Sequence, residues 1–428
     1  MAKDLFNTWC INPSYTIKKS IFSEEHNPER SLPSYKDSNS VCAYSAGSSV
    51  TKDKKKDLRF LMPTSNTHNV INYGAKGDGK TDDSKAFLSA WQKTCSTHGA
   101  STLVIPSKRV FLVKNIILKG PCQATKIQIQ LQGRIVAPQK NAWQGDKSTM
   151  ILFTNINGLR IVGKGGLIDG YGSSWWPCKN CPRPAVLGFN TCNGLSVSYL
   201  RITNSPQAHI TINGCDGAIF SHISIRSPAD SPNTDGIDIS SSKNIMIKDS
   251  NIATGDDCIA IIGDSSDINA TGIACGPGHG ISIGSLGKNN GHDKVEHVRV
   301  YNSSFTKTTN GARIKTFSGG SGYAKRITFE KITLNQVYNP IIIDQHYNNI
   351  MNGGGGVQLS EVTFRGFRGT SANDRAINLA CGSPGCFNIV LDKIKIVSSQ
   401  PGKPASCSCT NVHGRSTSTI PNCNYSLR

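Results

Sequence analysis

Three ionisable side chains share one position relative to short apolar strands. Asp235, Asp257 and His279 each lie two residues before an isoleucine that opens such a strand, and these isoleucines follow one another at steps of 22 residues. If successive strands stack in register, about 4.8 Å apart, the three side chains form a single column. Holding like charges this close is costly, which makes the column a candidate for chemistry.

A further carboxylate, Asp256, lies beside the column in the motif Gly-Asp-Asp-Cys. Crowding of three carboxylates raises the pKa of at least one of them, so one acid can stay protonated while its neighbours are ionised. Glycosidic cleavage needs these two states, because one group protonates the leaving oxygen and another activates water or attacks carbon. The residue types therefore predict a glycosidase. A calcium site and a purely structural ladder of Asp remain as alternatives.

Positive charge is expected on the same face. In Ala-Arg-Ile-Lys-Thr the apolar residues should point inward, so Arg313 and Lys315 should point outward in the rung after His279. Two cations disfavour calcium and suit a substrate carboxylate, which they would bind through charge-assisted hydrogen bonds. His279, between two glycines, could orient a carboxyl group or a substrate hydroxyl.

The elements that must position these residues are short and repeated. From about residue 150 the chain alternates short β-type segments with turn residues, at a loose period of 22 to 36 residues. Long helical segments are absent and blade-like hairpins are not seen, so an all-β parallel β-helix is predicted over an α/β sheet or a propeller. The anchors of one strand family are Ile210, Ile237, Ile259, Ile281, Ala312, Ile341 and Ile377.

The N-terminal part divides into two regions. Residues 1–66 are polar and rich in Ser, Lys, Asn and Pro, which predicts a flexible extension or pro-segment. Residues 67–428 are predicted to form the β-helix domain. It should open with a strand at Val70–Tyr73 and a short amphipathic capping helix at 82–91.

The formal net charge of +19 indicates an anionic polymer as partner. Nucleic acid is disfavoured because the lysines are scattered and no recognised motif is present. An acidic polysaccharide fits as well as nucleic acid does on charge alone. The longest apolar runs are too short for a transmembrane helix, so no membrane partner is expected, and we expect a monomer.

Fifteen cysteines favour disulfides and a secreted protein. The spacing Cys178-x-x-Cys181 leaves zinc as an alternative, although no second pair follows at a usable distance. Sequons at Asn269, Asn302 and Asn424 agree with secretion, whereas the first residues contain no apolar signal-type stretch. The disulfide candidates are Cys258, Cys275, Cys381, Cys386, Cys409 and Cys423.

Four motifs occur in order along the chain: Asn233-Thr-Asp235, Gly255-Asp-Asp257, Gly278-His-Gly280 and Arg313-Ile-Lys315. Together they resemble the signature motifs of the polygalacturonases, glycoside hydrolase family 28, and the resemblance to plant members covers roughly residues 67–428. It implies a right-handed parallel β-helix that hydrolyses α-1,4 bonds of homogalacturonan with inversion, without a metal or other cofactor. A secreted protein of the cell wall is expected.

The resemblance also implies roles for the matched residues. Asp256 would be the general acid, Asp235 and Asp257 would activate the attacking water, and His279 would tune the acid. The remaining matches would bind substrate: Arg313, Lys315, Asn233 and Tyr347.

The match at Tyr347 includes a departure from the family's pattern. Similar plant enzymes usually have Asp-Gln-Asn-Tyr-Cys, whereas this chain has His346 before the tyrosine and Asn348 after it. A pectate lyase on the same fold and a non-catalytic pectin-binding wall protein remain alternatives, and endo action is favoured over exo action.

Overall fold

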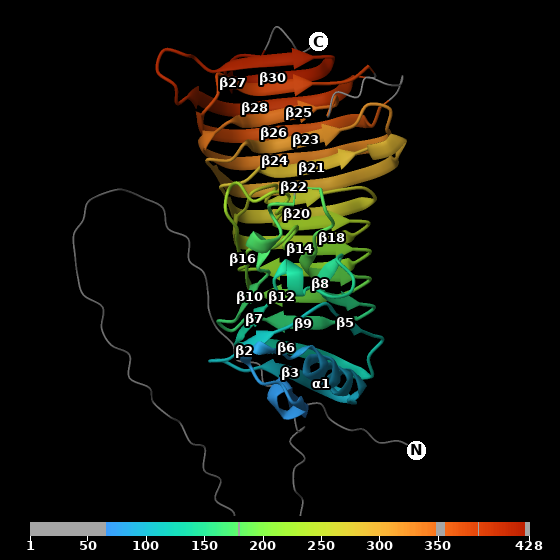
Figure 1. The fold of residues 1–428 in the computed structure, drawn as a ribbon. Helices are drawn as coiled ribbons and strands as arrows, with labels where there is room; N and C mark the ends of the chain where they lie inside the picture. Colours follow the sequence, from blue (N-terminus) through green and yellow to red (C-terminus); the bar gives the residue numbers. More distant parts are fainter. Residues whose placement is uncertain (1–65, 179, 348–355, 384, 424–428) are drawn as a thin grey trace, which may run out of the picture. The chain divides into compact units, whose positions relative to one another are not determined.

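The computed structural model describes residues 66–178, 180–347, 356–383 and 385–423, and these wind into a parallel β-helix (Figure 1). The predicted extension over residues 1–66 lies outside the described residues except for Asn66. Within the described part, no helix is long and apolar enough to cross a membrane.

One sheet of eleven described strands carries the predicted anchors, and each strand pairs in parallel with the next one along the chain. Its strands are β5 (Ile116–Lys119), β8 (Thr149–Thr154), β11 (Ala185–Asn190), β14 (Ile210–Asn213), β17 (Ile237–Ser240), β19 (Ile259–Ile261), β21 (Ile281–Leu286), β23 (Asn310–Thr316), β25 (Asn339–Asp344), β27 (Arg375–Ala380) and β29 (Ser406–Thr410).

The register confirms the predicted stacking. Ile237 pairs with Ile259, Ile259 with Ile281, and Ile281 with Ala312. All four side chains are fully buried in the core. Burying an isoleucine stabilises the fold by about 1.5–3 kcal/mol, so a slip of one residue, which would turn the anchors outward, is strongly disfavoured.

A second sheet of nineteen described strands forms the rest of the coil wall. Its strands are β1 (Asn66–Asn69), β2 (Asp78–Asp82), β3 (Gly99–Ile105), β4 (Val110–Leu112), β6 (Ala124–Leu131), β7 (Arg134–Val136), β9 (Leu159–Val162), β10 (Leu167–Asp169), β12 (Leu195–Ser198), β13 (Arg201–Thr203), β15 (Asp216–Ser221), β16 (Ser224–Arg226), β18 (Lys243–Ala253), β20 (Ser265–Cys275), β22 (His292–Thr306), β24 (Ser321–Val337), β26 (Gln358–Ser371), β28 (Cys386–Ser398) and β30 (Val412–Ile420).

Strands of this sheet bend at residues with left-handed backbone. In β18 one such residue is Asp249, with φ 49°, and the strand pairs with both β15 and β16 of the rung before it. In that earlier rung the bend lies between the two strands, at His222 with φ 55°. The bend turns a single strand around the core, which is how one coil can enclose an aliphatic interior.

A helix closes the N-terminal end of the coil, as the sequence predicts. Helix α1 (Ser84–Ser96) buries Phe87, Ala90 and Trp91. The ring of Trp91 packs edge-on against Phe153, at a centroid distance of 6.0 Å. The helix begins after Asp83, whose carboxylate accepts hydrogen bonds from the backbone of the preceding turn instead of joining the helix.

The predicted strand at Val70–Tyr73 is wrong, because these residues form the 3₁₀ helix η1 (Val70–Tyr73). Asn69 caps it by accepting a hydrogen bond from the backbone N of Ile71 at 3.0 Å, and Gly74 ends it with φ 98°. Asn is a common N-cap residue, so Asn69 favours a helical turn over a strand at this point. Three further 3₁₀ turns are η2 (Lys140–Ala142), η3 (Gly172–Ser174) and η4 (Lys288–Asn290).

Five disulfides are present in the described residues, joining Cys95 to Cys122, Cys178 to Cys181, Cys258 to Cys275, Cys381 to Cys386 and Cys407 to Cys423. The candidates Cys258, Cys275, Cys381 and Cys386 are confirmed as bonded cysteines.

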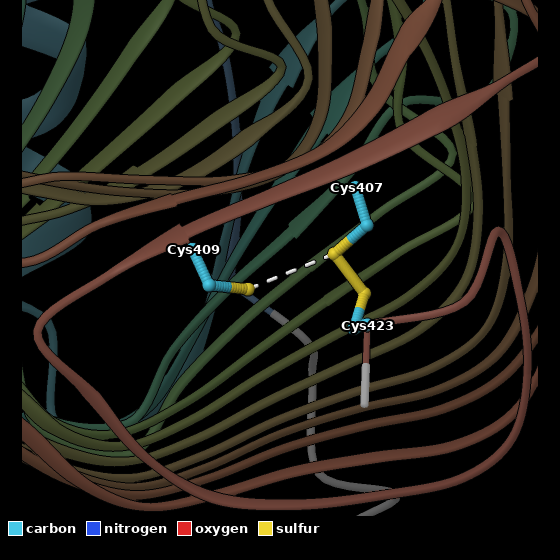
Figure 2. A group of neighbouring side chains, drawn as sticks. All are labelled: Cys407, Cys409 and Cys423. Carbon is cyan, nitrogen blue, oxygen red and sulfur yellow. Dashed lines mark hydrogen bonds between the residues drawn. A yellow bond between two sulfur atoms is a disulfide. The ribbon is translucent and has the colours of Figure 1, made fainter. Parts of the chain in front are cut away.

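The prediction for Cys409 is wrong, because Cys423 bonds to Cys407 and leaves Cys409 as a free thiol (Figure 2). Cys407 and Cys409 are two residues apart on β29, so both side chains lie on the same side of the strand. Sequence spacing therefore could not decide between them.

Candidate active site

The predicted column lies in the turns that precede β17, β19 and β21, which we call the turn ladder. Backbone hydrogen bonds stack these turns, from Gly236 N to Asp257 O and from Cys258 N to Gly280 O, each at 2.8 Å. At two motif positions only glycine fits, because a neighbouring backbone carbonyl lies too close for a side chain. A Cβ on Gly255 would lie 2.0 Å from the carbonyl oxygen of Ser231, and one on Gly280 would lie 2.2 Å from that of Asn310.

Asp257 is the centre of a buried ion-pair network. Its side chain is fully buried, and its oxygens accept hydrogen bonds from Arg313 Nη2 at 2.5 Å and Lys315 Nζ at 2.9 Å. The Ser282 hydroxyl donates to the same carboxylate at 2.9 Å and accepts from Arg313 Nε at 2.7 Å. Both cations thus already hold an internal carboxylate, and any substrate carboxylate would share them with Asp257.

Asp256, next in the chain, faces a more open environment. His279 Nδ1 lies 2.8 Å from Asp256 Oδ1, and their side chains are 37% and 18% exposed. Asn233 donates from Nδ2 to Asp256 Oδ2 at 3.4 Å. The two neighbouring aspartates therefore point into different surroundings, one closed and paired with cations, the other accessible beside an imidazole.

Two other carboxylates crowd the site. Burial raises the pKa of Asp235 well above its ordinary value, and the charges of Asp238, Asp256 and Asp257 add to this. Burial raises the pKa of Asp238 to about 7, again with help from Asp257 and Asp256. The Oδ1 of Asp238 is buried and has no hydrogen-bond partner among the described residues. Asp235 and Asp238 are therefore carboxyl groups that readily hold a proton.

The pKa of Asp256 shifts the other way. Its burial acts to raise the pKa, but the hydrogen bond from His279 and the charges of His279, Lys315 and Arg313 outweigh it and bring the pKa below its ordinary value. The carboxylate of Asp256 is thus ionised more readily than those of Asp235 and Asp238. Proton sharing in such a cluster belongs to the group as a whole.

Tyr347, implied by the resemblance, lies at the site. Lys315 Nζ is 5.3 Å from the centroid of its ring, and the ring packs edge-on against Phe317 at 5.4 Å. Its backbone N donates to Thr316 O at 3.2 Å. Every site residue named from the sequence thus contacts the cluster or lies in its stacked turns.

Four residues of the site were missed by sequence reasoning. Asp238 and Ser282 stand one position after an anchor isoleucine, so the alternation that placed Arg313 outward could also have found them. His209 donates its backbone N to Asp235 O at 2.8 Å, and Arg183 donates from Nη2 to Asn233 Oδ1 at 2.6 Å. His209 stands one position before the anchor Ile210, so the same register could have found it, whereas Arg183 has no sequence signal.

The contacts of Asp256 and Asp257 disfavour the calcium site that the sequence left as an alternative. Asp256, Asp257 and His279 place potential ligand atoms within 4.8 Å of one another. Both oxygens of Asp257 are engaged by cations, however, and one oxygen of Asp256 is engaged by the imidazole. A divalent cation would have to displace Lys315 or Arg313, which the charges disfavour.

Comparisons with known proteins agree with this geometry. Residues 95–420 match the family model described as glycosyl hydrolases family 28. A probable polygalacturonase of Arabidopsis thaliana is 47% identical over 370 residues, covering 84% of this chain and 81% of the relative. Polygalacturonase-2 of Solanum lycopersicum is 39% identical over 369 residues, with 83% and 80% covered.

Among solved structures, the endo-xylogalacturonan hydrolase from Aspergillus tubingensis is similar, with a TM-score of 0.74 and 25% identity. The similarity covers 82% of this chain and 99% of that structure.

Proposed function

Because the chain belongs to family 28 of the glycosyl hydrolases, we propose that it hydrolyses α-1,4-galacturonosidic bonds in homogalacturonan by acid–base catalysis with inversion. One observation carries the proposal: an accessible carboxylate hydrogen-bonded to an imidazole stands beside a buried carboxylate that holds two cations. An inverting glycosidase needs separated acid and base groups and a means to hold its substrate.

In the proposed mechanism Asp256 protonates the glycosidic oxygen. The family resemblance motivates this role, and the exposure of Asp256 supports it because a proton donor must reach the substrate. Asp235 and Asp257 would activate water on the opposite face of the sugar, with Asp235 accepting the proton. Asp257 would contribute by fixing the cations and the local charge.

Because the pKa of Asp256 is low, its role as the acid requires a step that raises this pKa. Part of the lowering comes from Lys315 and Arg313. A galacturonate carboxylate bound to these cations would offset their charge, and a bound sugar would exclude water from the carboxyl group. Both effects favour the protonated acid. Substrate binding would thus move a proton within the cluster towards Asp256.

Substrate recognition is proposed for the residues around this acid. Arg313 and Lys315 would share their donors between Asp257 and a substrate carboxylate, and Tyr347 would pack against the sugar beside Lys315. Asn233 would hydrogen bond to a substrate hydroxyl, held in place by Arg183. Methyl esters lack the negative charge, so esterified pectin should bind less tightly.

The wider setting follows from the same proposal. The substrate is an acidic polysaccharide, which the net charge of +19 favours, and the enzyme would act as a monomer outside the cell, in the wall. The five disulfides support an oxidising compartment. We propose residues 67–428 as the catalytic domain, supported by the first described strand at Asn66–Asn69.

The test is an assay of the purified chain on polygalacturonate in EDTA. We expect new reducing ends, no unsaturated products, and an initially inverted anomer by NMR. Loss of activity in EDTA with unsaturated ends would instead indicate a lyase, and binding without cleavage would indicate a wall-binding protein. Sizing of early products would separate endo action, which we favour, from exo action.

A further inference from the structure

The turn ladder continues beyond the catalytic rungs. Gly278 and Thr308 form a parallel bridge, and Thr309 N donates to Gly278 O at 2.8 Å. In the following rung Tyr338 N donates to Thr308 O at 3.0 Å. The turn of Tyr338 is therefore two rungs from that of His279, a rise of about 10 Å.

A hollow of about 630 Å³ opens on this continuation. Residues of four successive turns line it, among them Lys307, Thr308, Gln336, Tyr338 and Ser399. The volume lies within the usual range for small-ligand sites. The hollow is thus a surface of suitable size in register with the proposed acid.

The lining groups are complementary to a uronic acid. The side chain of Tyr338 is 52% exposed and offers an apolar ring face. Lys307 is exposed, lines the same hollow and adds a positive charge to it. A sugar ring and its carboxylate would each find a partner here.

We propose that this hollow is a subsite for an additional galacturonate residue of a chain whose scissile bond lies at Asp256. The inference rests on the proposed function and deepens it. Tyr338 packs against the sugar ring, and Lys307 pairs with the carboxylate. The subsite binds polymer and long oligomers, while short oligomers at the catalytic residues do not reach it.

The experiment is calorimetry of oligogalacturonates of increasing length, in an Asp256→Asn background that prevents turnover. Tyr338→Ala should weaken binding of long oligomers about five- to tenfold and leave the shortest ones unchanged. Tyr199→Ala is the matched control, because Tyr199 is 56% exposed but lies at a bend of the other sheet. It should bind all lengths as the background does.

The lysine can be tested with the backbone held constant. Lys307 has φ 52° and Lys393, which lies on β28, has φ 53°. Asn tolerates this left-handed conformation. Lys307→Asn should weaken the binding of long oligomers about two- to fivefold, and by less at high salt. Lys393→Asn should leave their binding unchanged.

Unchanged affinity in Tyr338→Ala, or equal losses for short and long oligomers, would overturn the subsite. The proposed function is tested separately by the unmodified chain. If that chain fails to cleave polygalacturonate, the function itself is wrong. If it cleaves normally and the hollow variants bind normally, only the subsite is wrong.

A second inference concerns three sulfur atoms near the C-terminus (Figure 2). Cys407 is bonded to Cys423, and the free Cys409 Sγ lies 3.6 Å from Cys407 Sγ. All three sulfurs lie within 4.8 Å of one another. Cys407 and Cys409 pair with Ile377 and Leu379 of the neighbouring strand, so both face the same side.

We infer that Cys423 can bond to either cysteine of β29 by intramolecular exchange. The Cys409 thiolate attacks Cys423 Sγ, a Cys409–Cys423 bond forms, and the Cys407–Cys423 bond breaks. Cys407 leaves as a thiolate and takes up the proton that Cys409 lost, so no oxidant is consumed. Burial raises the pKa of Cys409 to about 11, so the exchange speeds up with rising pH.

Disulfide mapping tests the exchange. After incubation at about pH 9, acid quenching and alkylation in denaturant, we expect modification at both Cys407 and Cys409. The Cys409→Ser control should show none at Cys407. Modification confined to Cys409 in the unmodified chain would overturn the inference. Cys407→Ser, refolded with glutathione disulfide, should form Cys409–Cys423, and two free thiols there would count equally against it.

Discussion

The two adjacent aspartates of the Gly-Asp-Asp motif divide the site into halves with opposite physical character. The buried half consists of Asp257, Ser282, Arg313 and Lys315, with the Asp257 side chain fully buried. The open half consists of Asn233, Asp256 and His279, with Asp256 18% exposed. Two adjacent residues can therefore serve different purposes, one in a structural charge network and the other in contact with substrate.

The largest expected effect lies in the open half. Asp256→Asn should lower kcat by about 10²–10⁴-fold, because the amide has no acidic proton to donate. Reducing-sugar release measures the loss, and thermal unfolding should show the fold retained. Near-normal turnover would assign the acid to another carboxylate.

A substitution in the buried half should lower the free energy of unfolding. Lys315→Met leaves Asp257 without one of its two cations, and breaking a buried pair costs about 3–5 kcal/mol. Denaturant unfolding measures the change. The control is Lys243→Met, whose partner Asp216 lies 3.4 Å away at the surface and whose side chain is 60% exposed. That variant should lose at most about 1 kcal/mol, and equal losses in the two variants would remove the distinction between the halves.

A smaller effect is expected at the edge of the buried half. The pKa of Asp238 is raised from 3.8 to about 7, so its contribution is most favourable below pH 3.8 and is lost as the pH rises through 7. Asp238→Asn removes that loss. The free energy of unfolding of the variant relative to the unmodified chain should therefore be about 1–3 kcal/mol more favourable at pH 8 than at pH 4.

Unfolding at a series of pH values checks this pH dependence. The control is Asp264→Asn at an exposed left-handed position with φ 56°. It should leave the pH dependence unchanged. A parallel pH dependence in Asp238→Asn and the unmodified chain would show that Asp238 is not the group responsible.

The sequence predicts the column well because its anchors are strongly constrained. Isoleucines that recur at equal steps must stay inside, and their register then places Asp235, Asp257 and His279 in stacked turns. Arg313 and Lys315 follow from the same alternation. The fold and these five residues were therefore accessible from periodicity, whereas Asn233 and Tyr347 came from the family resemblance.

Other features depend on contacts that periodicity does not encode. The partner of Cys423 is decided by the path of the chain after β30, and both cysteines of β29 satisfy the pattern. The engagement of Arg313 and Lys315 by Asp257 could not be foreseen either, because outward direction does not distinguish an internal partner from a substrate. Arg183 reaches the site from a rung that carries no motif.

The central claim is that proton transfer belongs to the open half, with Asp256 as the acid. His279 lowers the pKa of Asp256 through its hydrogen bond and charge, and kcat/KM reports ionisations of the free enzyme. The most direct test is therefore the pH profile of kcat/KM in His279→Ala beside that of the unmodified enzyme. In the free enzyme Asp256 has the lower pKa and Asp235 the higher one, so the acidic limb reports Asp256 and the basic limb reports Asp235. We predict that the acidic limb moves to higher pH in His279→Ala while the basic limb stays in place. An acidic limb that stays in place, or a basic limb that moves instead, would contradict the account.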